Sequence, residues 1–129
     1  MANSKGKVIG FWICTVLIIL SQGASGVMDL LQIGPAVEGI KALGYPTYVL
    51  YILGVAKIAG IIVIAAPGLK RLKEWAYAGF VIDFIGAAAS HALNGDTIAE
   101  IMPPIVVMGI LLGSYVLRPD SRRLDGPVI

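Results

Sequence analysis

Four long apolar runs constrain this chain more than any other feature of its sequence. They cover residues 8–30, 47–66, 74–93 and 98–117. Each run holds about 20 residues, the length that an α-helix needs to cross the hydrocarbon core of a bilayer. A backbone in lipid must satisfy its own hydrogen bonds, so such runs are predicted to be helices. The sequence therefore predicts an all-α membrane protein, an antiparallel bundle of four transmembrane helices in one domain, residues 1–129.

The composition agrees with a membrane protein and excludes several other classes. Hydrophobic residues make up 57% of the chain and charged residues 14%, far from a soluble average. The net charge of +2 predicts no nucleic-acid partner, so the expected partner is the lipid bilayer. The chain has one cysteine, Cys14, and one histidine, His91. This excludes an intramolecular disulfide, a CxxC redox motif and a bis-histidine haem within one chain, and no cofactor is predicted.

The first run has an alternative interpretation as a signal peptide. Lys5 and Lys7 precede it, and the small residues at 23–26 resemble a cleavage site,. Apolar residues resume at Val27 and Met28. We therefore expect a retained transmembrane span.

The basic residues predict the orientation of the spans. Eight of them would lie on one side of the membrane: Lys5, Lys7, Lys70, Arg71, Lys73, Arg118, Arg122 and Arg123. The other side would carry only Lys41. Because basic residues favour the cytoplasmic side, both termini are predicted to be cytoplasmic, in a bacterial inner membrane.

The connection between the first two spans predicts a short amphipathic helix at the outer interface. Pro35 suits a first helical turn, and Glu38 and Lys41 are spaced as an i,i+3 pair,. Gly44 suits the left-handed position at the end of the helix. The alternative is an irregular loop.

The start of the fourth span carries two further signals. Thr97 and Glu100 have the spacing of a capping box, which predicts a helix from Ile98,. Pro103 and Pro104 then fall in its second turn, where they favour a kink. Kinks beside cavities and kinks without a function are both ordinary in transmembrane helices.

Two charged residues are predicted inside the membrane. Lys57 lies about 15 Å from the outer end of its run and Asp83 about 14 Å from the inner end of its own, at roughly 1.5 Å per residue,. Both depths are near the bilayer centre, so the two side chains are predicted to pair. The pair is either a structural link between spans or part of a proton relay or ligand site.

A second group of polar residues is predicted near the outer end of the bundle. Asp29 ends the first span and His91 the third. Spacing of three and four residues places other polar residues on the same helical faces or at nearby depths: Gln22, Ser25, Ser90 and Glu100. These positions predict a polar vestibule that leads toward Lys57. A metal site at Asp29, His91 and Glu100 would need three spans to converge, and no HxxxH or ExxH spacing supports it, so no metal is predicted.

Several motifs of the chain resemble the DoxX-like family of small four-helix bacterial membrane proteins. They are Leu43-Gly44-Tyr45-Pro46-x-Tyr48, Leu53-Gly54-x-x-Lys57-x-x-Gly60, Leu72-Lys73-Glu74-Trp75-Ala76-Tyr77-Ala78-Gly79-Phe80, and Gly86-Ala87-x-x-Ser90-His91-x-x-x-Gly95-Asp96. The resemblance covers residues 26–117. It implies the four-helix fold and topology. It also implies a link to quinone-coupled redox complexes, although relatives that use thiols need cysteines that this chain lacks.

The leading hypothesis for function is binding of a small amphipathic molecule, of which a quinone is one candidate, in a pocket open to the outer side. The predicted ligand-binding residues are Lys57, Asp83, His91, Asp29, Ser90, Gln22, Ser25 and Glu100. No catalytic motif is visible, which counts against an autonomous enzyme. One alternative is an assembly subunit of a membrane complex. Another is a small proton-coupled transporter that acts as a dimer, with Gly109 and Gly113 as a candidate dimer seam,.

Overall fold

The fold is known from a computed structural model that describes residues 4–124. Residues 1–3 and 125–129 of the predicted domain lie outside this part. The described elements are α1 (Lys5–Leu31), α2 (Pro35–Ala42), α3 (Val49–Ala65), α4 (Lys70–Leu93), α5 (Ile98–Leu117) and the short 3₁₀ helix η1 (Asp120–Arg122). No strand occurs in residues 4–124, so the all-α prediction is confirmed there.

Within residues 4–124, three helices are long and apolar enough, by length and composition, to cross a membrane: α1, α4 and α5. The remaining apolar helix, α3, has 17 residues. At about 1.5 Å per residue it is roughly 26 Å long, slightly less than a hydrocarbon core of about 30 Å. The helices begin and end within a few residues of the predicted runs, because apolar length determines both.

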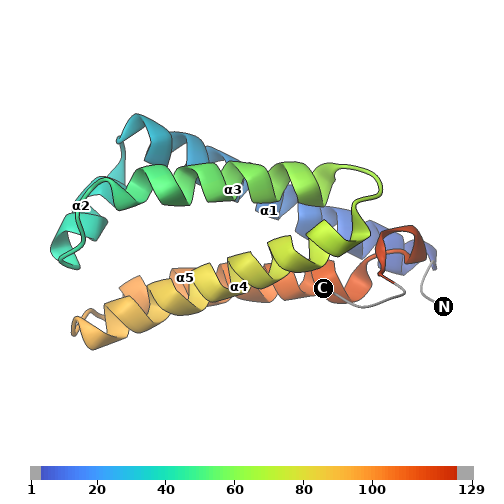
Figure 1. The fold of residues 1–129 in the computed structure, drawn as a ribbon. Coiled ribbons are helices and arrows are strands. Elements are labelled where there is room, and N and C mark those ends of the chain that lie inside the picture. Colours follow the sequence, from blue (N-terminus) through green and yellow to red (C-terminus); the bar gives the residue numbers. More distant parts are fainter. Residues whose placement is uncertain (1–3, 125–129) are drawn as a thin grey trace.

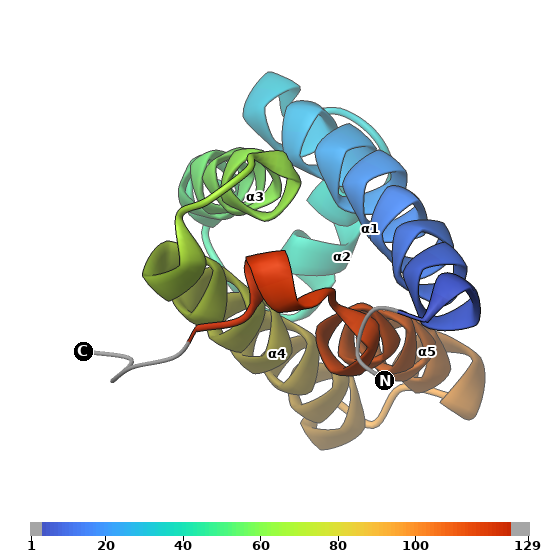
Figure 2. The ribbon, with the colours of Figure 1, turned by 90° about the vertical axis from the view of Figure 1, so that its right-hand side faces the viewer.

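The four long helices lie side by side, and each changes direction relative to the one before it (Figure 1). Helix α1 packs against α3 and α5, and α4 packs against α5. The contact between α3 and α4 is the least extensive of the four. Seen from the end that holds the termini, the long helices surround a centre, and α2 crosses behind it (Figure 2).

The hydrophobic core is formed mainly by aromatic and branched side chains: Ile18, Ile61, Ile64, Tyr77, Phe80, Phe84 and Leu111. A buried hydroxyl cluster lies beside it and joins α1, α4 and α5. The Oγ of Ser114 is 2.6 Å from Thr15 Oγ1 and 2.7 Å from Tyr77 Oη. Each hydroxyl is thereby satisfied, as burial requires.

Charged side chains tie the helix ends together where the termini lie. Lys73 is buried and donates to the backbone carbonyls of Val63 and Ala66, which end α3. Arg122 donates to Ile64 O at 2.7 Å, and Arg118 pairs with Glu74 at 2.9 Å. These contacts bring the start of α4 and the end of α5 to the same end as the last turn of α3 (Figure 1).

The short helix predicted between the first two spans is confirmed as α2, with Pro35 in its first turn. Glu38 and Lys41 form the expected pair, 4.0 Å apart, and Gly44 has a positive φ of 86°. The predicted start of α5 at Ile98 is also confirmed. The prediction of a capping box at Thr97 and Glu100 is wrong, because the Thr97 side chain makes no capping hydrogen bond.

The predicted dimer seam has two unlike glycines. A Cβ at Gly113 would lie 3.1 Å from Cys14 Sγ, so Gly113 packs against α1 within the chain. A Cβ at Gly109 would meet no atom within 4 Å. The close approach at Gly113 therefore serves packing within one molecule, and dimerisation stays a prediction.

Candidate functional site: a polar cavity at the α2 end

Lys57 of α3 binds two side chains of α1. Its Nζ donates to Asp29 Oδ2 at 3.0 Å and to Ser25 Oγ at 2.9 Å. The Lys57 side chain is 14% exposed and that of Asp29 is 1% exposed, so Asp29 is fully buried and Lys57 largely so. The prediction that Lys57 pairs with Asp83 is wrong, because its partner is Asp29. No ion pair within 4.0 Å joins Lys57 to Asp83 among the described residues.

Close packing of α1 on α3 explains why Lys57 reaches Asp29. A Cβ at Gly26 would lie 3.1 Å from the Cβ of Lys57, and a Cβ at Gly54 would lie 2.9 Å from Gly26 O. Only glycine allows the two backbones this close, as is common between membrane helices. The long Lys57 side chain then extends along α1 to the level of Asp29.

A cavity of about 490 Å³ lies between the helices at the α2 end. Seven of the eight predicted site residues line it: Gln22, Ser25, Asp29, Lys57, Asp83, Ser90 and His91. Glu100 is not among its lining residues. The predicted polar stripes on α1 and α4 thus face one space, and Pro103 and Pro104 of α5 form part of its wall.

Helix α2 and the segment after it cover one side of this cavity. The sequence pattern of α2 does not predict this role. Ile40 and Leu43 line the cavity together with Tyr45. The hydroxyl of Tyr45 is 3.1 Å from Ser90 Oγ, which links this cover to α4. The amphipathic pattern of α2 predicted an apolar face but gave no indication of what that face covers.

One oxygen of Asp29 is unsatisfied. Oδ2 accepts from Lys57, whereas Oδ1 is buried and has no hydrogen-bond partner among the described residues. A buried acceptor without a donor is costly, and such atoms mark positions where a ligand group fits. Asp29 lines the cavity, so it combines a side chain fixed by Lys57 with a buried acceptor oxygen that no described group satisfies.

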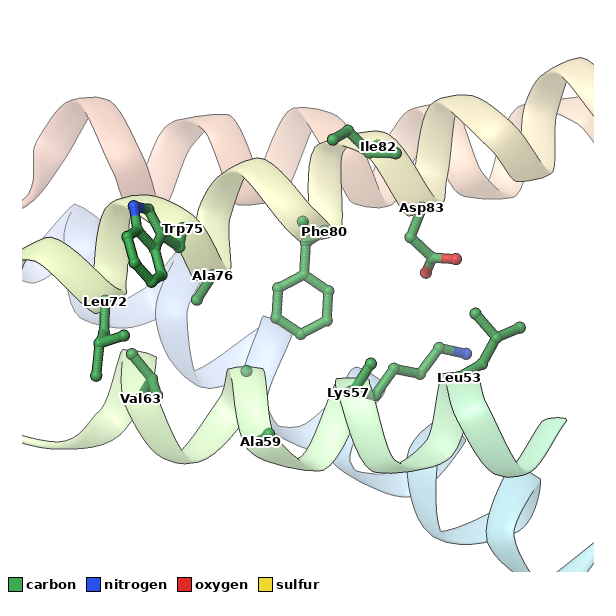
Figure 3. Close-up of a pocket in the computed structure, with 13 residues that line it drawn as sticks. Leu53, Lys57, Ala59, Val63, Leu72, Trp75, Ala76, Phe80, Ile82 and Asp83 are labelled. Atoms are coloured by element: carbon green, nitrogen blue, oxygen red, sulfur yellow. The ribbon is translucent and has the colours of Figure 1, made fainter. Parts of the chain in front are cut away.

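A second space, an apolar groove of about 480 Å³, lies between α3 and α4. Lys57 and Asp83 lie on facing helices at one end of the groove, and Leu72 and Trp75 lie at the other (Figure 3). Lys57 and Asp83 line the polar cavity as well. Asp83 is thus placed across the gap from Lys57, at the point where the two spaces meet.

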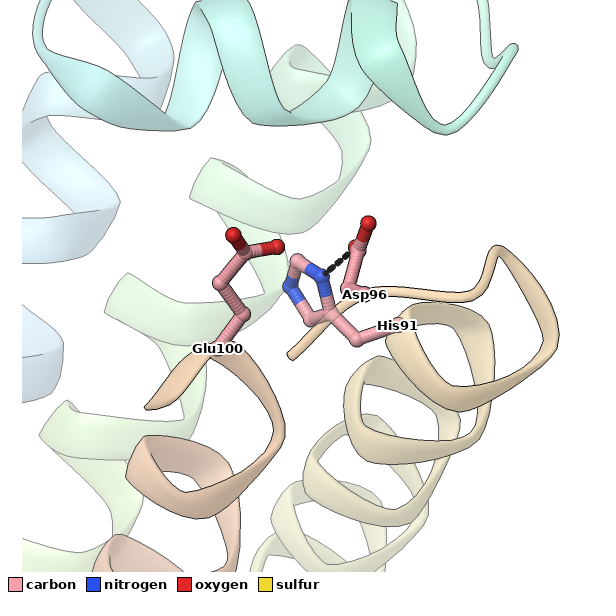
Figure 4. A group of neighbouring side chains, drawn as sticks. All are labelled: His91, Asp96 and Glu100. Carbon is pink, nitrogen blue, oxygen red and sulfur yellow. Dashed lines mark hydrogen bonds and ion pairs between the residues drawn. The ribbon is translucent and has the colours of Figure 1, made fainter. Parts of the chain in front are cut away.

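His91, Asp96 and Glu100 form a separate group at the junction of α4 and α5 (Figure 4). Their candidate ligand atoms all lie within 4.8 Å of one another. Asp29 does not belong to this group, so the residues considered for a metal in the sequence do not converge as a set. His91 Nδ1 is 2.6 Å from Asp96 Oδ2, and this hydrogen bond holds the pKa of Asp96 below its usual value.

These features define a class: a helical membrane protein with a polar cavity built around a buried ion pair. A family model described as the DoxX-like family matches residues 13–114. The chain therefore belongs to the DoxX-like family. The comparisons with curated proteins and with solved structures give no match.

Proposed function

We propose that this protein binds a small amphipathic molecule in the polar cavity, with the polar head of the molecule held at Lys57 and Asp29. A quinone is one candidate. The observation that carries the proposal is the position of the buried Lys57–Asp29 pair in the cavity wall, with Asp29 Oδ1 lacking a partner. Gln22, Ser90 and His91 supply further polar groups around the same space.

A purely structural role explains this arrangement less well. Burying an ion pair gives little net stability, and apolar residues of similar size often serve equally well. Ionisable residues within membrane spans commonly mark pathways or ligand sites. A structural pair would also be expected to have both carboxylate oxygens satisfied, which is not true of Asp29.

The proposal places α1, α3, α4 and α5 across a bacterial inner membrane as four antiparallel spans of one domain. Helix α3 is short, but it packs between α1 and α4, both of which are long enough to span. The basic residues Lys73, Arg118 and Arg122 lie at the end with the termini, which supports a cytoplasmic location for that end,. The cavity and α2 then face the outer side.

Co-purification tests the proposal. The protein is purified in a mild detergent from bacterial membranes, and bound small molecules are extracted and identified by mass spectrometry. Gly86→Leu should abolish the bound species, because Gly86 lines the cavity and a Cβ there meets no atom within 4 Å. Gly23→Leu is the matched control, since Gly23 also has open space but does not line the cavity. Equal retention by both variants would contradict the proposal.

A further inference from the structure

The polar cavity and the apolar groove adjoin each other. Leu53, Lys57, Ile82 and Asp83 line both. Among the residues that line the groove, only Lys57 and Asp83 have ionisable side chains. One molecule that occupied both spaces would therefore meet polar groups at one end and apolar groups along the rest of its length.

The groove lies where the bundle is least tightly packed. The α3–α4 contact is the least extensive of those that join the long helices. Ala56 on α3 and Ala76 and Gly79 on α4 leave room in it, whereas the ring of Phe80 packs against Gly60 and narrows the groove there. In a bilayer this gap faces hydrocarbon chains, so a hydrocarbon tail in it stays in an apolar environment.

The cavity also restricts the chemistry of the polar head. Two of the three donors of the Lys57 ammonium are directed at Asp29 Oδ2 and Ser25 Oγ,. The unsatisfied atom is an acceptor, Asp29 Oδ1, and the cavity wall holds two acidic side chains, Asp29 and Asp83, and one lysine. A head that only accepts hydrogen bonds leaves Oδ1 unsatisfied, whereas a hydroxyl group donates to it.

We propose that the ligand is an amphiphile with a hydroxyl-bearing head and a long apolar tail, whose head donates to Asp29 while its tail lies in the groove between α3 and α4. This inference rests on the proposed function and narrows it: the head carries a hydroxyl group, which an oxidised quinone lacks, the tail lies in the groove, and the ligand enters from the bilayer. The ion pair between Asp29 of α1 and Lys57 of α3 then recognises the head, and the groove between α3 and α4 selects for the tail.

Tryptophan fluorescence tests the inference in lipid nanodiscs. Trp75 lines the groove. The chain has two tryptophans, so Trp75 is the only one left in a Trp12→Phe background. The probe is a resorcinol with a twelve-carbon tail brominated at its end, because bromine quenches a tryptophan in contact with it. The matched probe is its dimethyl ether, which has the same tail but no hydroxyl donor.

The resorcinol probe should quench Trp75 saturably, and the dimethyl ether should give only the linear quenching expected of partition into lipid. Asp29→Asn should weaken saturable quenching roughly tenfold, because a charged acceptor binds a hydroxyl more strongly than a neutral one. Gly79→Leu should abolish it, since Gly79 lines the groove with open space at its Cβ. Gly23→Leu should leave it unchanged.

Equal quenching by the two probes, or saturable quenching that survives Gly79→Leu, would overturn the inference. Resorcinol without a tail separates this failure from that of the proposed function. If tail-free resorcinol raises the melting temperature of the protein in an Asp29-dependent manner while the brominated tail never quenches Trp75, the cavity binds a ligand and the groove assignment is wrong. If neither probe binds while co-purification yields a bound molecule that Gly86→Leu abolishes, the inference fails and the proposed function stands.

Discussion

Asp29 is distinguished at the residue scale by the unlike surroundings of its two oxygens. One accepts from Lys57, and the other is buried without a partner. Asp83, which lines the same cavity, makes no ion pair within 4.0 Å of Lys57 among the described residues. The two acidic side chains therefore differ: Asp29 holds the lysine, whereas Asp83 lines the space beyond it.

A double-mutant cycle tests the Lys57–Asp29 pair. Lys57→Met or Asp29→Leu alone should lower the free energy of unfolding by about 3–5 kcal/mol, because each leaves an uncompensated buried charge. The double variant should lose much less than the sum of the two. Reversible unfolding in detergent micelles measures all three. A parallel cycle with Lys57→Met and Asp83→Asn is the control, and coupling as large as in the first cycle would contradict the assignment of Asp29 as the direct partner.

A pH titration tests the hydrogen bond between His91 and Asp96. Because this bond lowers the pKa of Asp96 from its ordinary 3.8, the folded state favours the carboxylate. Its contribution to stability is therefore present above that ordinary value and is lost as the pH falls through the lowered pKa. The difference in melting temperature between the native protein and Asp96→Asn should shrink below about pH 4. A difference that stays constant from pH 7 to pH 3 would show that the bond does not stabilise the fold.

The elements illustrate which features follow from sequence and which do not. Apolar length and the signals at Pro35, Gly44 and Ile98 predicted helices close to those observed. The partner of Lys57 was missed because a depth calculation treats helices as equivalent rods. In the folded chain, the glycines at 26 and 54 draw α1 onto α3. The same packing brings Asp29, placed by sequence at a helix end, to the ammonium of Lys57.

Six of the predicted residues that line the cavity were found because polar residues recur at helical spacing on α1 and α4, and Lys57 of α3 was found because it is a charge within an apolar run. The cover formed by α2 and Tyr45 was not foreseen, since it depends on how the α1–α3 connection folds back across the bundle. The hydroxyl cluster of Thr15, Tyr77 and Ser114 was also missed. Isolated hydroxyls on three separate helices form no local pattern, and only tertiary packing brings them together.

Labelling of single cysteines tests the orientation of the helices. In a Cys14→Ala background, Glu38→Cys on α2 should react in intact cells with a membrane-impermeant maleimide, because Glu38 is 82% exposed at the predicted outer side. Ser121→Cys, exposed in η1, should react only after the cells are permeabilised. The basis is the positive charge at the end that holds the termini. Reaction at position 121 in intact cells would reverse the proposed topology.

The two ends of the described molecule differ: the core and its charged contacts lie near the termini, and the polar cavity lies toward α2. The aromatic core and the charged contacts of Lys73, Arg118 and Arg122 hold the helices together near the termini. Toward α2 the helices enclose the polar cavity, and the groove between α3 and α4 joins it at Lys57. This division fits a ligand-binding membrane protein better than a subunit whose interior serves packing alone.

The most direct test of the central claim is an experimental structure of the protein purified with its native lipids. We expect density for a bound molecule between Lys57 and His91, with a polar atom within hydrogen-bond distance of Asp29 Oδ1. A structure in which apolar side chains fill that space, or in which both oxygens of Asp29 are satisfied by protein groups, would contradict the claim.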